Sequence, residues 1–582
     1  MTVPSRGTLL LMGAAAAAAC AAAVAVTGGI DLRLAGVPLR ARSWDRPALL
    51  ALLLLALGIA TSRGEFIALI RRIGTEGAVE RLARLAALAA VCWAALAALG
   101  FGTFAAGGAD SYGYISQADM LSRGRLLDVL PRDPAFTWPG ADDSLTPLGY
   151  VKDSARGLLL PQYPPGLPLL MAPLAALHAR AVFLLVPTCA AAAIFLCWRL
   201  GRRLGEPLAG AFAAVLLSVS PTFLYQAVQP MSDVPVMACW MAALLLAAED
   251  RRRNAAASGV IASIAILIRP NLAPLLILVA AAAAAAGARI DWRRAAVCLA
   301  ASLPGLLALG VIQQVRFGSP LASGYGAAGG LFAVSHIGPN LARYPAWMTA
   351  AHSPFILLWV LAPLWIRGRE TGVRRLAWIA YGFAWAVVLA YLPYVYFRRE
   401  EWFYSRFLLP GLPVMLVFGT VLLLAGVRRI LPREGAERAS ALLVAALVLF
   451  CLTKAQAFGV FSLHAGERKY PAVGAFVREN LPSNAAVFAM QHSGSLRYYA
   501  NRLTLRWDVL DGSALDSAVA AVSQAGYEPY LVLDPHEEPM FHARFSGAAP
   551  AALDNLVPVG SIRGTRVYAF SREADRRERG SR

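Results

Sequence analysis

The chain has 582 residues, of which 58% are hydrophobic and only 15% are charged. Soluble domains carry about 25% charged residues, so this composition excludes an ordinary soluble protein. Apolar runs recur from Leu9 to about Phe461, and a spanning helix needs about 20 such residues. We therefore expect an integral membrane protein with about 13 transmembrane helices.

In chain order, the candidate spans begin near residues 8, 47, 83, 180, 206, 234, 255, 271, 295, 354, 376, 407 and 438. The apolar stretch from Gly166 to Leu177 is too short to span and favours a re-entrant or interfacial helix. Residues 1–28 allow two interpretations, a first span or a cleaved signal peptide, because Arg6 precedes a long alanine run.

The net charge of +19 would suggest a nucleic-acid partner in a soluble chain, but the positions of the arginines argue against nucleic-acid binding. They cluster in every second loop, which is the positive-inside pattern of cytoplasmic loops. The pattern predicts a cytoplasmic N-terminus and an external C-terminus; the arginines at positions 33, 40, 42 and 46 do not fit it. The clusters are Arg71, Arg72, Arg81 and Arg84; Arg199, Arg202 and Arg203; 251–253; Arg289, Arg293 and Arg294; 367–375; and 428–438.

Three segments are not membrane-like, and all fall on the predicted external side. They are a first loop (107–165), a second loop (316–352) and the chain after about residue 464. Residues 464–571 alternate short elements and predict a small α/β domain, followed by a charged tail, 572–582. Its predicted helices are 470–481 and 513–525, and its strands are 485–490, 503–509, 530–534 and 566–570. The fold class is thus an all-α polytopic membrane domain, 1–463, with a C-terminal α/β extracytoplasmic domain.

Asp110 stands out among the seven aspartates of the first loop. It follows the third predicted span, where the chain leaves hydrocarbon, and it precedes an apparently amphipathic segment, 111–122. Ionisable groups at membrane depth are functional candidates. The first loop closes with the sequence QYPPGLP, residues 162–168, whose prolines predict a rigid turn as the chain re-enters the membrane.

These motifs carry a resemblance to a known family. GADSYGYISQADMLSRG (108–124) followed by YPPGLPLLMAPL (163–174) resembles the GT-C glycosyltransferases, and most of all the bacterial relatives of the protein mannosyltransferases and of the lipid A aminoarabinose transferase. The resemblance implies that Asp110 is the catalytic carboxylate, although Ser111 replaces the glutamate that often follows it. QPMSDVPVMACWMAALLLA resembles the family's second acidic position, which falls on Asp233.

The resemblance implies a multi-pass protein of a bacterial inner membrane that moves a sugar from a polyprenyl phosphate to a cell-envelope acceptor at the outer face. The transfer needs a base for the acceptor hydroxyl, whereas the phosphate leaving group needs no acid because its second pKa is about 6. Asp110 is the candidate base, and Asp233 is a candidate to orient the acceptor or, with Asp110, to hold a divalent metal ion. No cofactor is certain. Candidate substrate-binding residues are Arg406, Arg269, Lys152, Arg156, Tyr163 and His352, with His336 as a further candidate.

Other signals are rejected. GYGAAG (324–329) has the spacing of a dinucleotide loop but lacks a preceding strand, and there is no Walker A motif. The seven cysteines lie in predicted spans without a CxxC pair, so neither disulfides nor a zinc site is expected. Asp508 and Asp511 fit loop and capping roles. Two alternatives stay open: a secondary transporter or lipid flippase, and a polysaccharide ligase or polymerase that would use the same lipid donor.

Overall fold

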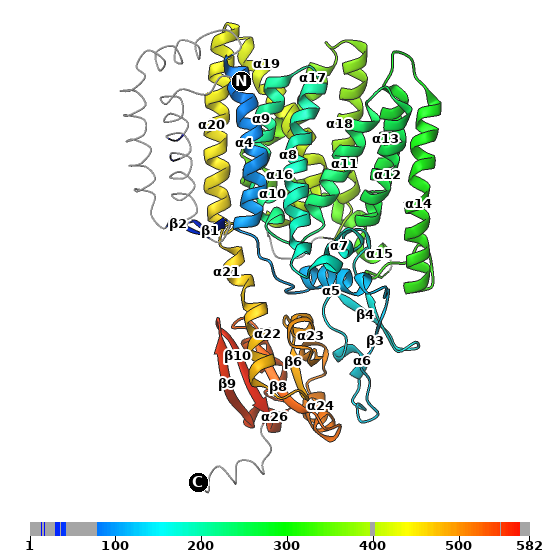
Figure 1. Cartoon of the computed structure of the whole chain (residues 1–582), viewed down its shortest axis with the longest axis vertical. Helices are drawn as coiled ribbons and strands as arrows, with labels where there is room; N and C mark the ends of the chain where they lie inside the picture. Colours follow the sequence, from blue (N-terminus) through cyan, green and yellow to red (C-terminus); the bar gives the residue numbers. More distant parts are fainter. Residues whose placement is uncertain are drawn as a thin grey trace.

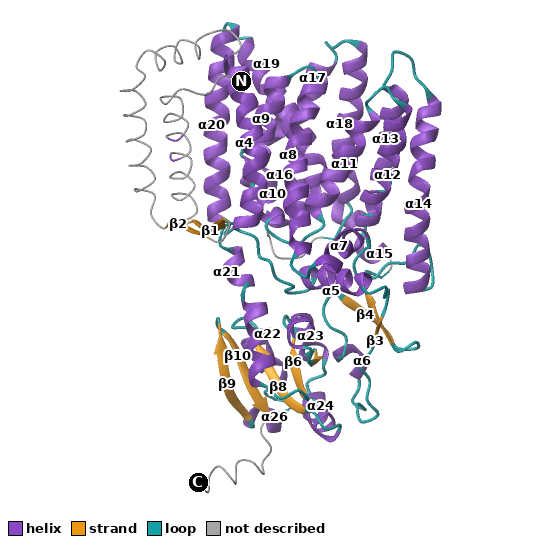
Figure 2. Cartoon of the chain, in the orientation of Figure 1, coloured by secondary structure: helices purple, strands orange, loops and turns teal. Residues whose placement is uncertain are grey.

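The computed structural model describes residues 78–326, 328–395, 402–547 and 549–570, and before them residues 13 and 17 and a hairpin of β1 (Ile30–Leu34) and β2 (Val37–Ala41). The helices form a bundle, and most strands lie beneath one end of it (Figures 1 and 2). The spans predicted near residues 8 and 47, nearly all of residues 1–28 and the tail 572–582 lie outside the described residues.

Within the described residues, six helices are long and apolar enough to cross a membrane. They contain α4 (Ala78–Gly100), η1 (Ala181–Leu184) with α8 (Leu185–Arg203), α14 (Trp292–Phe317), α18 (Thr371–Tyr391), η5 (Trp402–Gly411) with α19 (Leu412–Arg428), and α20 (Arg433–Ala457). Shorter helices complete the bundle: α11 (Asp233–Ala247), α12 (Arg252–Ile268), η2 (Pro270–Leu272) and α13 (Leu275–Ala285).

Two bent helix pairs raise the number of potential spans to eight. The first pair, α9 (Pro207–Ser218) and α10 (Pro221–Ala227), bends by 59°. The second bends by 119° and joins η3 (Val334–His336) and α16 (Ile337–His352) to η4 (Pro354–Leu361) and α17 (Ala362–Ile366). A proline begins the second half of each pair, where a missing N–H costs a helix least. The protein is therefore a multi-span helical bundle, and the count of 13 spans stays a prediction.

The arginine-rich turns of the bundle meet at one end. Their arginines share three acidic partners, Glu206, Glu249 and Asp250, which join the turns α8–α9, α11–α12, α13–α14, α17–α18 and α19–α20. The chain enters α11 at Asp233 and leaves it next to Glu249, so Asp233 lies at the opposite end. The ion pairs are Arg199 and Arg203 with Glu249, Arg369 and Arg428 with Glu206, and Arg294 with Asp250.

Small residues let the helices pack closely. A Cβ on Gly201 of α8 would lie 2.2 Å from the Cα of Gly210 in α9, and a Cβ on Gly259 of α12 would lie 2.0 Å from the carbonyl oxygen of Cys298 in α14. Close approach of backbones through small residues is the usual basis of helix association in membranes. The alanine-rich composition thus reflects packing between helices as well as contact with lipid.

The first loop folds against the end of the bundle opposite the arginine-rich turns. It contains α5 (Asp110–Ser122), α6 (Ala141–Ser144) and an antiparallel sheet of order β3-β5-β4, and it leads into the short apolar helix α7 (Gly166–Leu177). The strands are β3 (Asp128–Val129), β4 (Tyr150–Asp153) and β5 (Leu158–Pro161). Figure 1 shows α5, α7 and α15 (Ala328–Leu331) together at this end.

The C-terminal region (residues 464–570) contains a five-stranded mixed sheet of order β7-β6-β8-β10-β9. The strands are β6 (Ala485–Ala489), β7 (Leu503–Leu505), β8 (Glu528–Leu533), β9 (Leu556–Ile562) and β10 (Thr565–Phe570). β6 pairs parallel with β7 and β8, whereas β10 pairs antiparallel with β8 and β9. The helical elements are α21 (Leu463–Glu467), α22 (Lys469–Asn480), α23 (Ser493–Ala500), η6 (Trp507–Val509), α24 (Ala514–Gln524), α25 (Glu538–Phe545) and α26 (Pro550–Asp554).

The second loop differs from its prediction, because α16 makes its last sixteen residues helical. Tyr344, Trp347, Met348 and Ala351 are buried at helical spacing, which gives this segment one apolar face for the bundle. The strand predicted at 503–509 is shorter in the structure, since β7 ends at Leu505 and a 3₁₀ turn follows. β9, α23 and α25 have no counterpart in the sequence prediction.

The C-terminal region and the first loop share one hydrophobic core. Tyr112, Trp138 and Leu145 from the loop cluster with Phe488 and Trp507 from the C-terminal region. Hydrogen bonds cross the same interface: the Ala106 N–H donates to the Tyr499 hydroxyl at 2.8 Å, and the Arg506 N–H donates to the Ser144 carbonyl at 2.6 Å. The C-terminal region therefore packs against the loop that carries Asp110 and stabilises it.

Candidate active site

A cavity of about 770 Å³ opens where the first loop meets the bundle. It is lined by residues of α5, the turn before α7, the start of α11, the break between α12 and α13, α14, and η5. The cavity brings together five of the residues predicted from the sequence: Asp110, Tyr163, Asp233, Arg269 and Arg406. These residues are spread over almost 300 positions of the chain.

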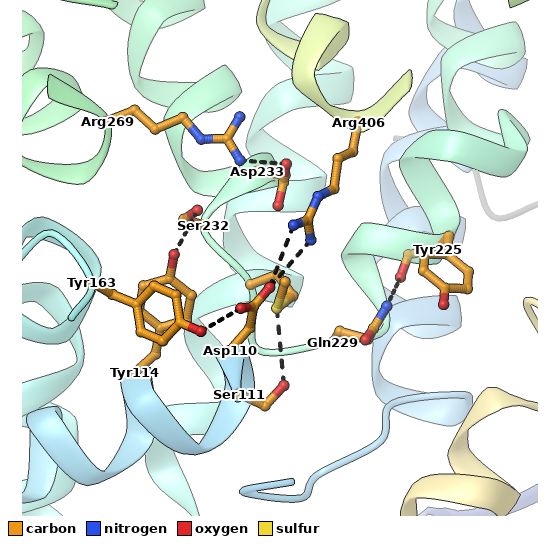
Figure 3. Close-up of polar contacts among 11 residues, drawn as sticks. Asp110, Ser111, Tyr114, Tyr163, Tyr225, Gln229, Ser232, Asp233, Arg269 and Arg406 are labelled. Atoms are coloured by element: carbon orange, nitrogen blue, oxygen red, sulfur yellow. Dashed lines mark hydrogen bonds and ion pairs between the residues drawn. The ribbon is translucent and has the colours of Figure 1, made fainter. Parts of the chain in front are cut away.

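Asp110 is the first residue of α5, and its carboxylate points into the cavity between Tyr163 and Arg406 (Figure 3). The Tyr163 hydroxyl donates to Oδ1 at 2.6 Å. Both Nη atoms of Arg406 lie 3.4 Å from Oδ2. A carboxylate in the first turn of a helix is also stabilised by the helix dipole. Asp110 is thus held in place, and its loosely bonded Oδ2 has room to accept another hydrogen bond.

Asp233 and Arg269 form a second, more deeply buried ion pair above the first (Figure 3). Arg269 Nη2 donates to Asp233 Oδ1 at 2.5 Å, and the side chain of Asp233 is only 1% exposed. Asp233 Oδ2 and Arg269 Nη1 are buried and have no hydrogen-bond partner within the described part of the chain. Unpaired buried polar atoms are costly, so a cavity ligand that bonds to them would gain affinity.

Aromatic side chains complete the walls of the cavity. The ring of Phe407 lies 5.6 Å from the guanidinium carbon of Arg269 and 5.3 Å from that of Arg406, which is cation–π distance. The Tyr163 ring packs between Tyr114 and Tyr325, with centroid distances of 4.9 and 6.1 Å. Burial, together with the negative charge of Asp110, raises the pKa of Tyr163 well above its ordinary value. The phenol therefore stays protonated and serves as a donor.

Glycines allow the segments around Asp110 to approach one another. A Cβ on Gly113 of α5 would lie 2.4 Å from the Tyr163 ring, and one on Gly166 would lie 2.2 Å from the Ile268 nitrogen. Gly149 has φ of +84°, and a Cβ there would lie 2.8 Å from the Ala109 carbonyl oxygen. The Tyr-Pro-Pro-Gly turn thus lies against both α5 and the end of α12, which brings Tyr163 to Asp110.

Three predicted site residues do not line the cavity. Lys152 in β4 forms an ion pair with Asp143 at 2.5 Å. Arg156 pairs with Asp153, and its guanidinium also donates to the Val315 carbonyl at 2.8 Å, so it caps the last turn of α14. His352 is buried at the end of α16, where Nε2 lies 2.7 Å from Ser220 Oγ. The additional candidate His336 lies near the Pro393 carbonyl, at 3.1 Å.

The sequence prediction missed several residues that line the cavity, among them Arg316, Gln313, Tyr114 and Tyr325. Tyr114 lies within the motif 108–124 and Arg316 begins the second loop, but nothing in their spacing indicated that they turn inward. Gly324 belongs to the rejected dinucleotide-like motif. A Cβ there would lie 2.4 Å from the Gln162 carbonyl oxygen, which shows why glycine occupies a segment that crosses the Tyr163 turn so closely.

The described residues contain one group with the spacing of metal ligands, Asp534, His536 and Glu537 in the C-terminal region. Its oxygens are already bonded: Asp534 accepts from His492 at 3.2 Å and Thr565 at 2.6 Å and contacts Lys469, and Glu537 accepts from two backbone N–H groups. Burial raises the pKa of Glu537 to about 7. Against the opposing effect of burial, hydrogen bonds from His492 and Lys469 lower the pKa of Asp534. The carboxylate oxygens of this cluster therefore already have hydrogen-bond partners within the protein.

Part of the chain matches a known family model. Residues 162–313 match the model of the family described as dolichyl-phosphate-mannose-protein mannosyltransferase. The matched stretch includes Tyr163, Asp233 and Arg269, whereas Asp110 and Arg406 lie outside it. A search of curated proteins finds no significant match.

Among solved structures, the oligosaccharyltransferase of Archaeoglobus fulgidus, tethered to an acceptor peptide, is 15% identical with a TM-score of 0.48, over 84% of this chain and 74% of that chain. ArnT of Cupriavidus metallidurans bound to undecaprenyl phosphate is 13% identical with a TM-score of 0.49, over 86% of this chain and 99% of that chain. The match of residues 162–313 to a mannosyltransferase family model supports the transferase activity that the motifs predict.

Proposed function

We propose that the protein is a membrane glycosyltransferase that moves a sugar from a polyprenyl-phosphate donor to a hydroxyl of a cell-envelope acceptor, with Asp110 as the general base. The observation that carries the proposal is the arrangement in one cavity of a fixed carboxylate, a second carboxylate and two guanidinium groups. The family match, whose description includes a prenyl-phosphate sugar, supports the choice of donor.

The proposed reaction breaks the bond between the anomeric carbon and the phosphate oxygen. Asp110 Oδ2 accepts the proton of the acceptor hydroxyl as that oxygen bonds to the anomeric carbon. The bonding electrons leave with the phosphate, whose second pKa of about 6 lets it depart without an acid. Arg406 and Arg269 offset the growing charge on the phosphate oxygens. Asp233 Oδ2, which has no partner among the described residues, orients the acceptor.

We further propose that transfer does not require a divalent metal ion. Arg406 faces Asp110 and Arg269 faces Asp233, so each carboxylate already has the positive partner that a shared ion would supply. Turnover that is unchanged by a chelator in wild-type protein supports this view. Loss of turnover on chelation, with recovery on adding one divalent ion, would instead place a metal between the two carboxylates.

The proposed setting is a bacterial inner membrane, with the N-terminus in the cytoplasm and the cavity and C-terminal region outside. The ion-paired turns support it, because they gather the arginines at the end of the bundle away from Asp233. The positive-inside rule assigns that end to the cytoplasm. Cysteine labelling with an impermeant reagent tests the orientation: a cysteine placed at exposed Val559 is expected to react in intact cells.

The decisive experiment follows radiolabel from polyprenyl-phosphate sugars to envelope acceptors with purified protein. Asp110→Asn is expected to reduce transfer by roughly 10²- to 10⁴-fold, the usual contribution of a general base. Asp119→Asn is the matched control, because Asp119 lies on the same helix but pairs with exposed Arg123 at its surface. Normal transfer by a folded Asp110→Asn variant would refute the proposal.

A transporter is the second candidate, since the two bent helix pairs resemble the broken helices of transporters. Neither bent pair contributes to the lining of the Asp110 cavity, which favours the transferase. Movement of a prenyl-phosphate sugar across proteoliposomes, with no labelled product in the presence of acceptor, would favour the transporter instead.

A further inference from the structure

Arg316 is a cavity-lining arginine that lacks an acidic partner. It lies in the last turn of α14 and is 1% exposed. Its Nη1 donates to the Tyr163 carbonyl at 3.4 Å. The Gln117 amide oxygen, in the orientation that satisfies both side chains, accepts from Nη2 at 2.5 Å and Nη1 at 3.0 Å. Its Nε has no partner among the described residues, and no described carboxylate lies within ion-pair distance.

A buried charge without a counter-ion is expensive, and the other cavity arginines show the contrast. Arg269 faces Asp233 and Arg406 faces Asp110, so these four side chains sum to zero formal charge. Arg316 leaves the cavity with a single positive charge. Burial of an unpaired guanidinium costs several kcal/mol unless a ligand brings the opposite charge. The cavity is thus electrostatically complete only with one anionic group bound.

Neighbouring residues indicate what carries that anion. Leu306, Leu309 and Ile312 of α14 line the same cavity, and they form an apolar path that leads along the helix to Arg316. Gln313, one turn before Arg316, is the polar residue on that path. An apolar chain that ends in a phosphate oxyanion matches both features. A free inorganic anion would match only the charge.

We propose that Arg316, held by Gln117, binds the phosphate of a prenyl-phosphate lipid whose chain lies along α14, and that this residue selects the charged lipid over the neutral alcohol. The proposal rests on the function proposed above and deepens it. Its partner Gln117 is a positioning residue: it orients the guanidinium without neutralising it, which leaves the charge for the ligand.

Binding to purified protein in nanodiscs of neutral lipid tests the proposal without any transfer reaction. The probes are undecaprenyl phosphate, undecaprenol, inorganic phosphate and phosphatidylglycerol. Wild-type protein is expected to bind undecaprenyl phosphate at least tenfold more tightly than the other three. Arg316→Gln is expected to remove this preference while leaving the affinity for undecaprenol unchanged. Arg132→Gln, which breaks an exposed ion pair with Asp142, is the matched control and is expected to bind as wild type does.

Gln117→Glu supplies a second, independent variant. The new carboxylate would neutralise Arg316 from within, so binding of undecaprenyl phosphate should fall at least tenfold although the arginine is kept. If Arg316 is merely structural, this variant would be more stable and bind the lipid normally. Arg316→Gln without ligand should unfold at the same temperature as wild type or higher, because it removes an uncompensated charge; a structural arginine would give a lower temperature.

Several outcomes would overturn the proposal. These are wild-type affinity for undecaprenyl phosphate in both folded variants, an equal loss of affinity for the phosphate and the alcohol, or equal binding of inorganic phosphate or phosphatidylglycerol by wild type. If Arg316→Gln fails to fold, Gln117→Glu decides. Charge-selective binding without transfer would refute the proposed function and leave the Arg316 site standing. Transfer by wild type together with wild-type lipid binding by both variants would refute the Arg316 site and leave the proposed function standing.

Discussion

The buried ion pair between Arg269 and Asp233 gives a quantitative test of the site. Arg269→Gln would leave the Asp233 carboxylate, which is 1% exposed, without its hydrogen-bonded ion-pair partner. Breaking a buried pair from one side costs about 3 to 5 kcal/mol, whereas removing both charges leaves neither group uncompensated. We therefore expect the double variant Arg269→Gln/Asp233→Asn to be more stable than Arg269→Gln alone, with a coupling of at least about 2 kcal/mol.

The assay is a double-mutant cycle of unfolding free energies in mixed micelles. The exposed pair of Arg132 and Asp142 in the first loop is the matched control, for which a coupling of roughly 0 to 1 kcal/mol is expected. A cost of less than about 1 kcal/mol for Arg269→Gln, or losses that simply add in the double variant, would contradict this expectation.

Three further predictions concern the Asp110 site and the C-terminal region that packs against its loop. Tyr163→Phe removes a hydrogen bond to the proposed base, worth about 1.5 to 3 kcal/mol, and should slow transfer roughly 10- to 150-fold with unchanged folding; an unaltered rate contradicts this. Burial raises the pKa of Glu537 from 4.5 to about 7, so the stability that this carboxyl contributes is present below pH 4.5 and is lost as pH rises through 7. The unfolding free energy of Glu537→Gln should therefore rise relative to that of wild type by up to about 3 kcal/mol between pH 4.5 and 8. A difference in melting temperature that does not change with pH would contradict this. Gly494→Val should displace α5 and lower transfer, because a Cβ there would lie 2.1 Å from the Tyr112 ring; Gly372→Ala, which meets no described atom within 4 Å, should be silent.

The membrane class and five residues of the candidate site could be predicted from the sequence because local signals carry them. A span is a local property, since about 20 apolar residues in a row suffice to define it. Asp110, Asp233, Arg269 and Arg406 each stand at the polar border of an apolar run, and such borders at one end of a bundle lie at similar depth. Their convergence on one cavity follows from that shared depth.

Pairing within the site could not be predicted, because it depends on which side chains face each other across the bundle. Lys152 and Arg156 share the polarity and loop of Asp110, yet nearby aspartates in the same small sheet bind them. His352 lies in a segment that the sequence assigned to a loop, but α16 buries it in the bundle. Charge type and approximate depth are readable from sequence, whereas the nearest partner depends on the folded chain.

Arg316 is a site residue whose position in the fold could not be predicted from the sequence either. In the sequence it ends a long apolar helix, where arginines usually extend toward lipid headgroups. In the structure the segment at Gly324 crosses closely over Gln162, next to the Tyr163 carbonyl that accepts from Arg316, and the Arg316 side chain is buried. The same fold that hides this charge also places it beside the cavity of Asp110. A charge that cannot reach water must find its counter-ion inside, and a ligand's anion is the partner that the described chain leaves for it.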